Sequence, residues 1–86
     1  MILISHRINT IEELKQTKKF YGVEVDLRDE KRGVYIHHDP FKKGILFKDY
    51  LKHYKHKFII CNIKSERIEF EVINIFKKFS IKNYFL

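Results

Sequence analysis

Two short apolar runs that do not alternate with polar residues constrain the fold of this chain more than any other feature. Residues 2–4 read Ile-Leu-Ile, and residues 58–63 read Phe-Ile-Ile-Cys-Asn-Ile. A strand that is apolar on both faces is typical of a parallel sheet covered by helices. Amphipathic stretches, which favour helices, lie at residues 10–21, 47–54 and 66–79. The alternation predicts βαβ units and hence an α/β fold, a mainly parallel sheet with flanking helices.

A hairpin interrupts this alternation. Residues 23–28 alternate strictly between apolar and charged side chains, which predicts a strand with its three charged residues on one face. Residues 29–33 form the expected loop and residues 34–37 the return strand. Residues 83–86 are typical of a strand that is just beginning. The expected order, β-α-β-β-α-β-α-β, amounts to about half of a TIM-type (β/α) barrel with one hairpin, because a whole barrel needs eight strands and ~250 residues.

Three local patterns refine the expected helices. Asn9 or Thr10 is suited to cap the first helix, with a glutamate three residues further on. The second helix has apolar residues at helical spacing, namely Phe47, Tyr50, Leu51 and Tyr54. In the third helix the residues at helical spacing, expected to form its core-facing side, are Phe70, Ile73 and Phe76 or Lys77.

Length and composition limit the kind of protein. With 86 residues the chain is expected to form a single domain over 1–86, a truncated amino-terminal half of the barrel. The 44% hydrophobic and 34% charged fractions exclude a disordered tail or a low-complexity fibre. No apolar run approaches the ~18–20 residues of a membrane span, so we expect a cytoplasmic protein without a transmembrane segment. Cys61, the one cysteine, forbids an internal disulfide and is expected to be an inert core thiol.

The chain is basic, but its charge is dispersed. Lys and Arg number 18 against 11 Asp and Glu, a formal net charge of +7. The lysines are scattered along the chain, whereas a nucleic-acid-binding surface concentrates them on one face. We therefore expect no nucleic-acid partner and only a preference for anionic ligands.

Chemically useful polar residues fall at the ends of the predicted strands. They are His6, Arg7, Glu24, Asp26, Asn62 and Lys64. Glu24 and Asp26 are two residues apart on one strand face, ~6.6 Å along the chain, and can converge on one cation. A hairpin that turns near residues 31–32 places His38 opposite residue 24 or 25. Since parallel sheets carry their chemistry at the carboxyl ends of strands, these residues form a candidate site.

Simpler interpretations of the same residues stay open. Glu24, Asp26 and Arg28 are also what the solvated face of a half-exposed strand carries. The histidines assigned to surface or structural roles are His37, His53 and His56.

Four short motifs stand at the expected strand ends, namely His6-Arg7, Glu24-Val-Asp26, His38-Asp39-Pro40 and Asn62-Ile-Lys64. Taken together, they resemble the amino-terminal half of the glycerophosphodiester phosphodiesterase family, barrel enzymes related to phosphatidylinositol-specific phospholipase C. The resemblance implies a phosphoric diester hydrolase of lipid metabolism, which cleaves a small glycerophosphodiester-type substrate with the help of a metal ion. It leaves open whether so short a chain is active.

The resemblance also implies roles for individual residues. His6 and His38 would be the catalytic general base and acid, and Arg7 and Lys64 would bind the phosphate. The implied ligands of a divalent cation, Ca²⁺ or Mg²⁺, are Glu24, Asp26 and Asn62. The chain departs from the family where Ile8 replaces a glycine and where Asn62 replaces a metal-binding glutamate. Glu66 is close enough to compensate only if the loop after Asn62 bends back.

A second class of function competes with the first. The chain is also interpretable as a non-catalytic α/β module that binds anionic ligands or proteins and self-associates. A half-barrel has two open sheet edges, so we expect either a homo-oligomer or a missing carboxyl-terminal half. In a homo-oligomer Phe85 and Leu86 are expected to be buried in the contact.

Overall fold

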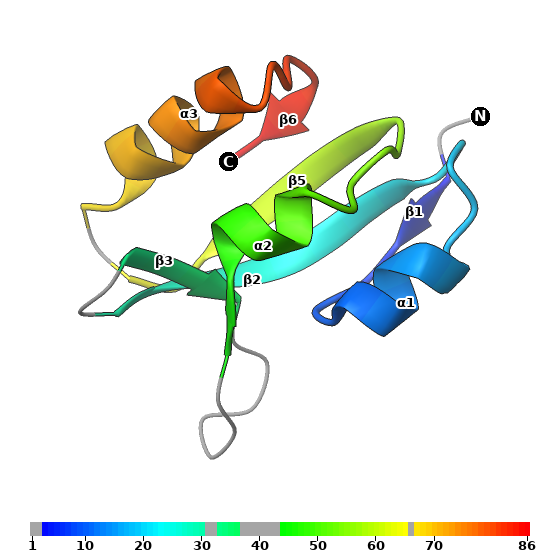
Figure 1. Ribbon diagram of the computed structural model, residues 1–86, viewed down its shortest axis with the longest axis horizontal. Helices are drawn as coiled ribbons and strands as arrows, with labels where there is room; N and C mark the ends of the chain where they lie inside the picture. The colour runs from blue at the N-terminus through cyan, green and yellow to red at the C-terminus, as the bar shows by residue number, and fades with distance from the viewer. Residues whose placement is uncertain (1–2, 31–32, 37–43, 66) are drawn as a thin grey trace.

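The computed structural model describes residues 3–30, 33–36, 44–65 and 67–86. In this part of the chain (Figure 1) the elements are β1 (Ile4–Ser5), α1 (Ile11–Gln16), β2 (Gly22–Glu30), β3 (Gly33–Ile36), β4 (Ile45–Leu46), α2 (Phe47–Leu51), β5 (Phe58–Ile63), α3 (Glu69–Lys78) and β6 (Tyr84–Phe85). This order matches the expected one apart from β4, which the sequence analysis did not anticipate. No helix among the described residues is long and apolar enough to cross a membrane.

The sheet is built around the long strand β2. Its path runs β4-β3-β2-β5-β6, and β1 also pairs with β2. Three pairings are parallel, those of β1 with β2, β2 with β5 and β5 with β6. The other two are antiparallel, because β3 runs opposite to both β2 and β4. The described strands therefore form a small, open, mixed sheet.

This mixed sheet corrects the fold class predicted from the sequence. The expectation of a mainly parallel sheet forming about half of a TIM-type barrel is wrong. The hairpin pairs Glu30 with Gly33 and continues to the pair Leu27–Ile36, so β3 is a full member of the sheet. β4 then extends this antiparallel flank through Tyr35 and Leu46. Apolar runs and helix periodicity predicted the parallel strands, but they gave no information on how far the hairpin would extend the sheet.

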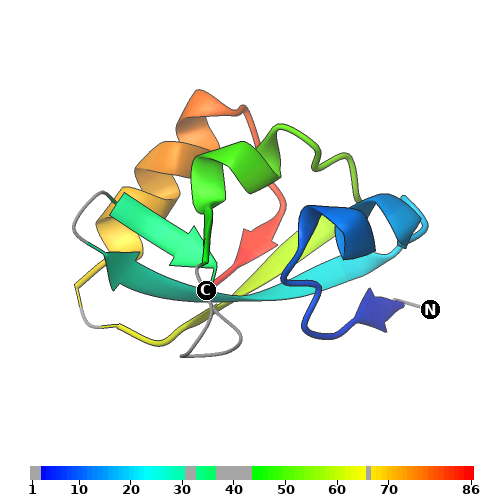
Figure 2. The same ribbon diagram turned by 60° about the horizontal axis from the view of Figure 1, so that its bottom comes forward.

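The core lies between the sheet and the three helices, which all pack on one side of it (Figure 2). The sheet contributes the buried residues Val23, Val25, Leu27, Ile59 and Cys61. The helices contribute Leu14, Phe47, Tyr50, Leu51, Val72, Ile75 and Phe76. Burial raises the pKa of the Cys61 thiol to about 12, so this side chain stays protonated at neutral pH and is an inert core residue, as expected.

The first helix begins with the capping residue that its sequence predicts. The Thr10 hydroxyl accepts a hydrogen bond from the Glu13 amide at 3.1 Å and donates one to the Glu13 carboxylate at 2.9 Å. This reciprocal pair satisfies one of the free backbone donors at the start of the helix. With Thr10 as the cap, Asn9 lies just outside the helix and is available for other contacts.

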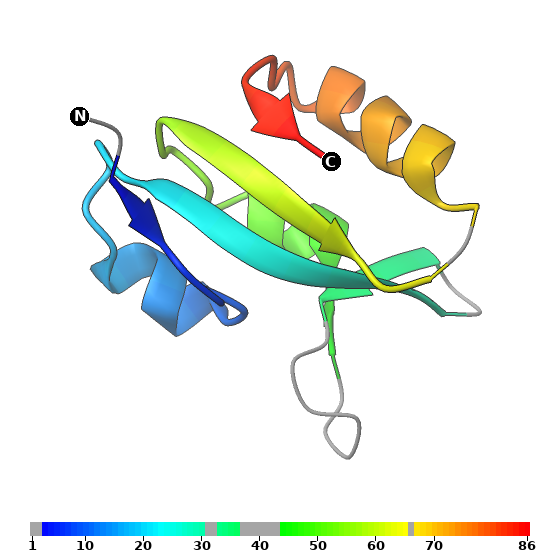
Figure 3. The same cartoon turned by 180° about the vertical axis from the view of Figure 1, so that it is seen from behind.

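The other side of the sheet carries no helix in the described part of the chain (Figure 3). Strand register places Phe58 beside Gly22 on this open face, where a Cβ on Gly22 would collide with the Phe58 ring. Further along the same face, Ile60 lies beside Glu24 and Asn62 lies beside Asp26. The open face is thus apolar near the amino ends of its parallel strands and polar near their carboxyl ends.

Candidate functional site

A gap in strand pairing along one edge of β2 determines where the site lies. On this edge β1 pairs with β2 only as far as Val23, and β3 pairs with it only from Leu27 onward. The chain that follows β1 enters the gap, where the Ile8 amide donates to the Glu24 carbonyl at 2.8 Å. Arg7 directs the chain there with a φ of 52°, a left-handed conformation that few non-glycine residues adopt. The predicted site residues of β1 and β2 therefore meet at this gap.

The side chain of Asn9 completes this edge of β2. Its Oδ1 atom accepts a hydrogen bond from the Asp26 amide at 3.0 Å, and its Nδ2 atom donates to Asp26 Oδ2 at 3.0 Å. Both residues are buried, with exposed fractions of 6% and 7%. Because two hydrogen bonds join the same two residues, the Asp26 carboxylate has a fixed orientation. Asn9 was considered only as a helix cap in the sequence, and its supporting role was missed.

His6 and Glu24 form a close pair of titratable side chains in the site. His6 Nδ1 lies 3.5 Å from Glu24 Oε1, and the two side chains are 73% and 24% exposed. Protonated His6 forms an ion pair in this arrangement. Neutral His6 with its hydrogen on Nδ1 faces the carboxylate as a donor, which leaves a lone pair on Nε2. The pair is thus suited to take up and return a proton at Nε2.

A second anchor ties this segment to the helical layer. The Tyr50 hydroxyl, on α2, donates a hydrogen bond to the Ile8 carbonyl at 2.7 Å. Burial raises the pKa of Tyr50 well above its usual range, so the hydroxyl keeps its proton. The chain between His6 and Asn9 is therefore held from two sides, by β2 and by α2. The sequence showed Tyr50 only as a core-facing residue of a helix.

The remaining predicted residues are less closely gathered. Asn62 is exposed on β5, in register with the buried Asp26 on β2. Arg7 and Lys64 are both exposed, and no described contact joins either side chain to His6, Glu24 or Asp26. His38, the expected general acid, lies outside the described residues, as does Glu66.

The donor set suits a hard cation only in part. Glu24, Asp26 and Asn62 offer carboxylate and amide oxygens on one sheet face, which is the chemistry that Ca²⁺ and Mg²⁺ prefer. Among the residues that the structure describes, however, no three His, Cys, Asp or Glu side chains are close enough to hold a metal ion. Two carboxylates and one amide supply few ligands, so any cation here would keep much of its water shell.

Of the other histidines, His53 and His56 lie in the described part of the chain, and no described contact joins either to His6, Glu24 or Asp26. His53 is exposed after α2. His56 Nε2 lies 2.9 Å from the Thr17 carbonyl at the end of α1, a contact in which the ring nitrogen donates. His37 lies outside the described residues. The structural and surface roles expected for His53 and His56 are consistent with these positions.

Replacing Asn9 with alanine should lower the free energy of unfolding by about 1–3 kcal/mol, because it removes two hydrogen bonds and leaves the buried Asp26 amide without its acceptor. Urea denaturation followed by circular dichroism measures this change. Asn74→Ala, at an exposed position on α3, is the control and should change stability by less than about 0.5 kcal/mol. Equal effects of the two substitutions would contradict the supporting role of Asn9.

Comparisons with protein-family models, with curated proteins and with solved structures find no match to this chain.

Proposed function

We propose that the cluster of His6, Glu24 and Asp26, near the carboxyl ends of the parallel strands, is a phosphoric diester hydrolase-like site. It binds a divalent cation and cleaves a glycerophosphodiester-type substrate. One observation carries this proposal: His6 and Glu24 approach each other to 3.5 Å beside the Asp26 carboxylate, which Asn9 holds in place. A histidine paired with a carboxylate is a suitable proton carrier near neutral pH. The resemblance of the sequence motifs to glycerophosphodiester phosphodiesterases supports the same chemistry.

The proposed reaction breaks one P–O ester bond of the diester. A water oxygen attacks the phosphorus and forms the new P–O bond. His6 takes the proton of this water at Nε2, while Glu24 stabilises the imidazolium through Nδ1. The departing alkoxide receives a proton from an acid, the role that the resemblance gives to His38. Arg7 and Lys64, both exposed, would bind the phosphate and offset its charge, the role that the resemblance gives them.

The cation, which would be held by Glu24, Asp26 and Asn62, would polarise the phosphoryl oxygens. The protein favours this binding by holding the Asp26 carboxylate in a fixed orientation. Since Asn62 provides a neutral oxygen where the family has a charged one, we expect weak affinity. We therefore expect a dissociation constant of ~10⁻⁴–10⁻³ M, the range typical of weak calcium sites.

Metal binding is testable by isothermal titration with CaCl₂ and MgCl₂. Glu24→Gln and Asp26→Asn should each weaken binding at least about tenfold, the loss that removal of even a supporting residue typically causes. Asp49→Asn is the matched control, because Asp49 is an exposed carboxylate that pairs with Lys52 on α2. Absence of binding heat at millimolar ion, or equal binding by all four proteins, would refute the metal site.

The competing function, a non-catalytic module that self-associates, has one observation in its favour. Phe85 is 60% exposed and Leu86 is 50% exposed at the open edge of β6, although both are large apolar residues. Light scattering at micromolar concentration distinguishes a monomer from a dimer or aggregate. This alternative gives no role to the His6–Glu24 pair.

A further inference from the structure

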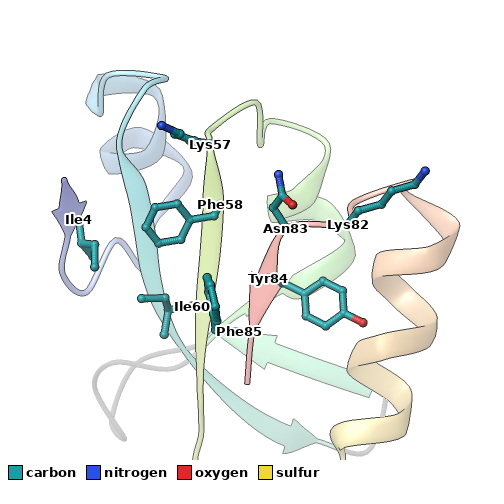
Figure 4. Close-up of a pocket in the computed structure, with 8 residues that line it drawn as sticks. All are labelled: Ile4, Lys57, Phe58, Ile60, Lys82, Asn83, Tyr84 and Phe85. Carbon is teal, nitrogen blue, oxygen red and sulfur yellow. The ribbon is translucent and has the colours of Figure 1, made fainter. Parts of the chain in front are cut away.

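A hollow of about 500 Å³ lies on the open face of the sheet, near the amino ends of the parallel strands (Figure 4). Its floor is apolar and extends from Ile4 on β1 across Phe58 and Ile60 on β5 to Phe85 on β6. The rings of Phe58 and Phe85 meet edge to face with centroids 5.8 Å apart. Gly22 contributes no side chain between Ile4 and Phe58, which lets the Phe58 ring lie flat over β2. The hollow has the size of a small-molecule site.

The rim of the hollow is basic at one end. Lys57 precedes β5, and Lys82 and Asn83 precede β6, so all three stand at the amino end of the face. Figure 4 shows the two lysines extending from this end on either side of Asn83. No acidic side chain is among the described residues that line the hollow. Lys57 and Lys82 therefore make this end of the hollow positively charged.

We infer that this hollow binds an anionic single-chain amphiphile as a free monomer, with the chemistry of a medium-length fatty carboxylate. The alkyl chain lies across the apolar floor, and the carboxylate lies at the rim near Lys57, Lys82 and the Asn83 amide. A second copy of this chain is disfavoured as the occupant, because each copy carries a net charge of +7 and the two copies repel each other. The inference does not rest on the proposed phosphodiesterase function, since no residue assigned to that function lines the hollow.

Isothermal titration tests this inference with three probes below their micelle concentrations, in a chelating buffer that removes divalent ions. Decanoate should bind, acetate should not, and decyltrimethylammonium, which has the same chain and the opposite charge, should bind more weakly than decanoate. Each methylene added from octanoate to decanoate should strengthen binding by up to about fourfold, as burial of a methylene predicts.

Two variants locate the binding. Lys57→Gln/Lys82→Gln should weaken decanoate binding by about three- to tenfold, the effect of losing two partly exposed ion pairs. Phe85→Ser should weaken it at least about tenfold through loss of the aromatic floor. Phe70→Ser, which alters an 82% exposed phenylalanine on α3, is the matched control and should bind like the unmodified chain.

Three results would overturn the inference. Equal affinity for decanoate and decyltrimethylammonium would remove the role of the lysines, and equal losses in Phe70→Ser and Phe85→Ser would indicate unspecific adsorption. Sedimentation that shows a dimer of the unmodified chain and a monomer of Phe85→Ser would assign the hollow to a second copy. Because chelator is present throughout, failure here leaves the outcome of the metal titration unaffected.

Discussion

Replacing Phe76 with alanine is expected to lower the free energy of unfolding by about 3–5 kcal/mol, the cost of truncating a buried phenylalanine. Its ring is fully buried, meets Phe47 edge to face at 5.6 Å and stacks on Tyr84 at 4.3 Å. It thus connects α3 to α2 and to the edge strand β6. A domain of this size has only about 5–15 kcal/mol of stability, so the substitution is expected to remove a large part of it. Urea denaturation followed by circular dichroism measures the change.

Phe70→Ala is the control for this substitution, on the same helix. Phe70 is the exposed phenylalanine of α3, so its truncation should change stability by less than about 0.5 kcal/mol. If the two substitutions cost the same, α3 does not pack through Val72, Ile75 and Phe76 as described.

Replacing His6 with alanine is expected to have the second large effect, a loss of catalytic turnover. If His6 carries the proton of the proposed reaction, turnover of a phosphodiester should fall by ~10²-fold or more. Because His6 is exposed, the substitution should leave the urea midpoint unchanged, which separates a chemical role from a structural one. The expected loss is in kcat, because the histidine acts on proton transfer in the transition state more than on substrate binding.

His53→Ala provides the matched comparison, because His53 is an exposed histidine after α2 with no described contact to the cluster. Its turnover should equal that of the unmodified chain. A His6→Ala variant with unimpaired kcat would show that another group carries the proton.

Patterns that depend on one strand or one helix were predictable from the sequence. The alternation at residues 23–28 and the apolar run at 58–63 became β2 and β5, and the hairpin turns where expected, between Glu30 and Gly33. Thr10 caps α1, and the second helix buries Phe47, Tyr50 and Leu51 as its spacing indicates. These features follow from local chemistry.

The orientation of α3 was not predictable in the same way. We expected Phe70 to face the core, and it is exposed, whereas Val72 and Ile75 are buried. Both sets of residues recur at helical spacing, so periodicity alone does not choose between them. The choice is made by tertiary contacts, above all those of Phe76 with Phe47 and Tyr84.

The same limit explains what sequence reasoning missed at the candidate site. Asn9 and Asp26 are separated by 17 positions, and their two hydrogen bonds exist only because β1 and β3 leave a gap along β2. The placement of His6 beside Glu24 could be predicted from the sequence, because both residues lie where adjacent parallel strands carry their polar groups. The one signal for the contact of Asn9 with Asp26 in the sequence was that Thr10 suffices as the cap, which leaves the Asn9 amide for another partner.

The most direct test of the account is hydrolysis of bis(p-nitrophenyl) phosphate by the unmodified chain, followed by release of p-nitrophenolate. We predict release that requires millimolar Ca²⁺ or Mg²⁺, stops on addition of chelator, and is lost in Glu24→Gln but retained in Asp49→Asn. Release no faster than in buffer at high protein concentration, or release that Glu24→Gln leaves unchanged, would contradict the proposal that the His6–Glu24–Asp26 cluster cleaves phosphodiesters.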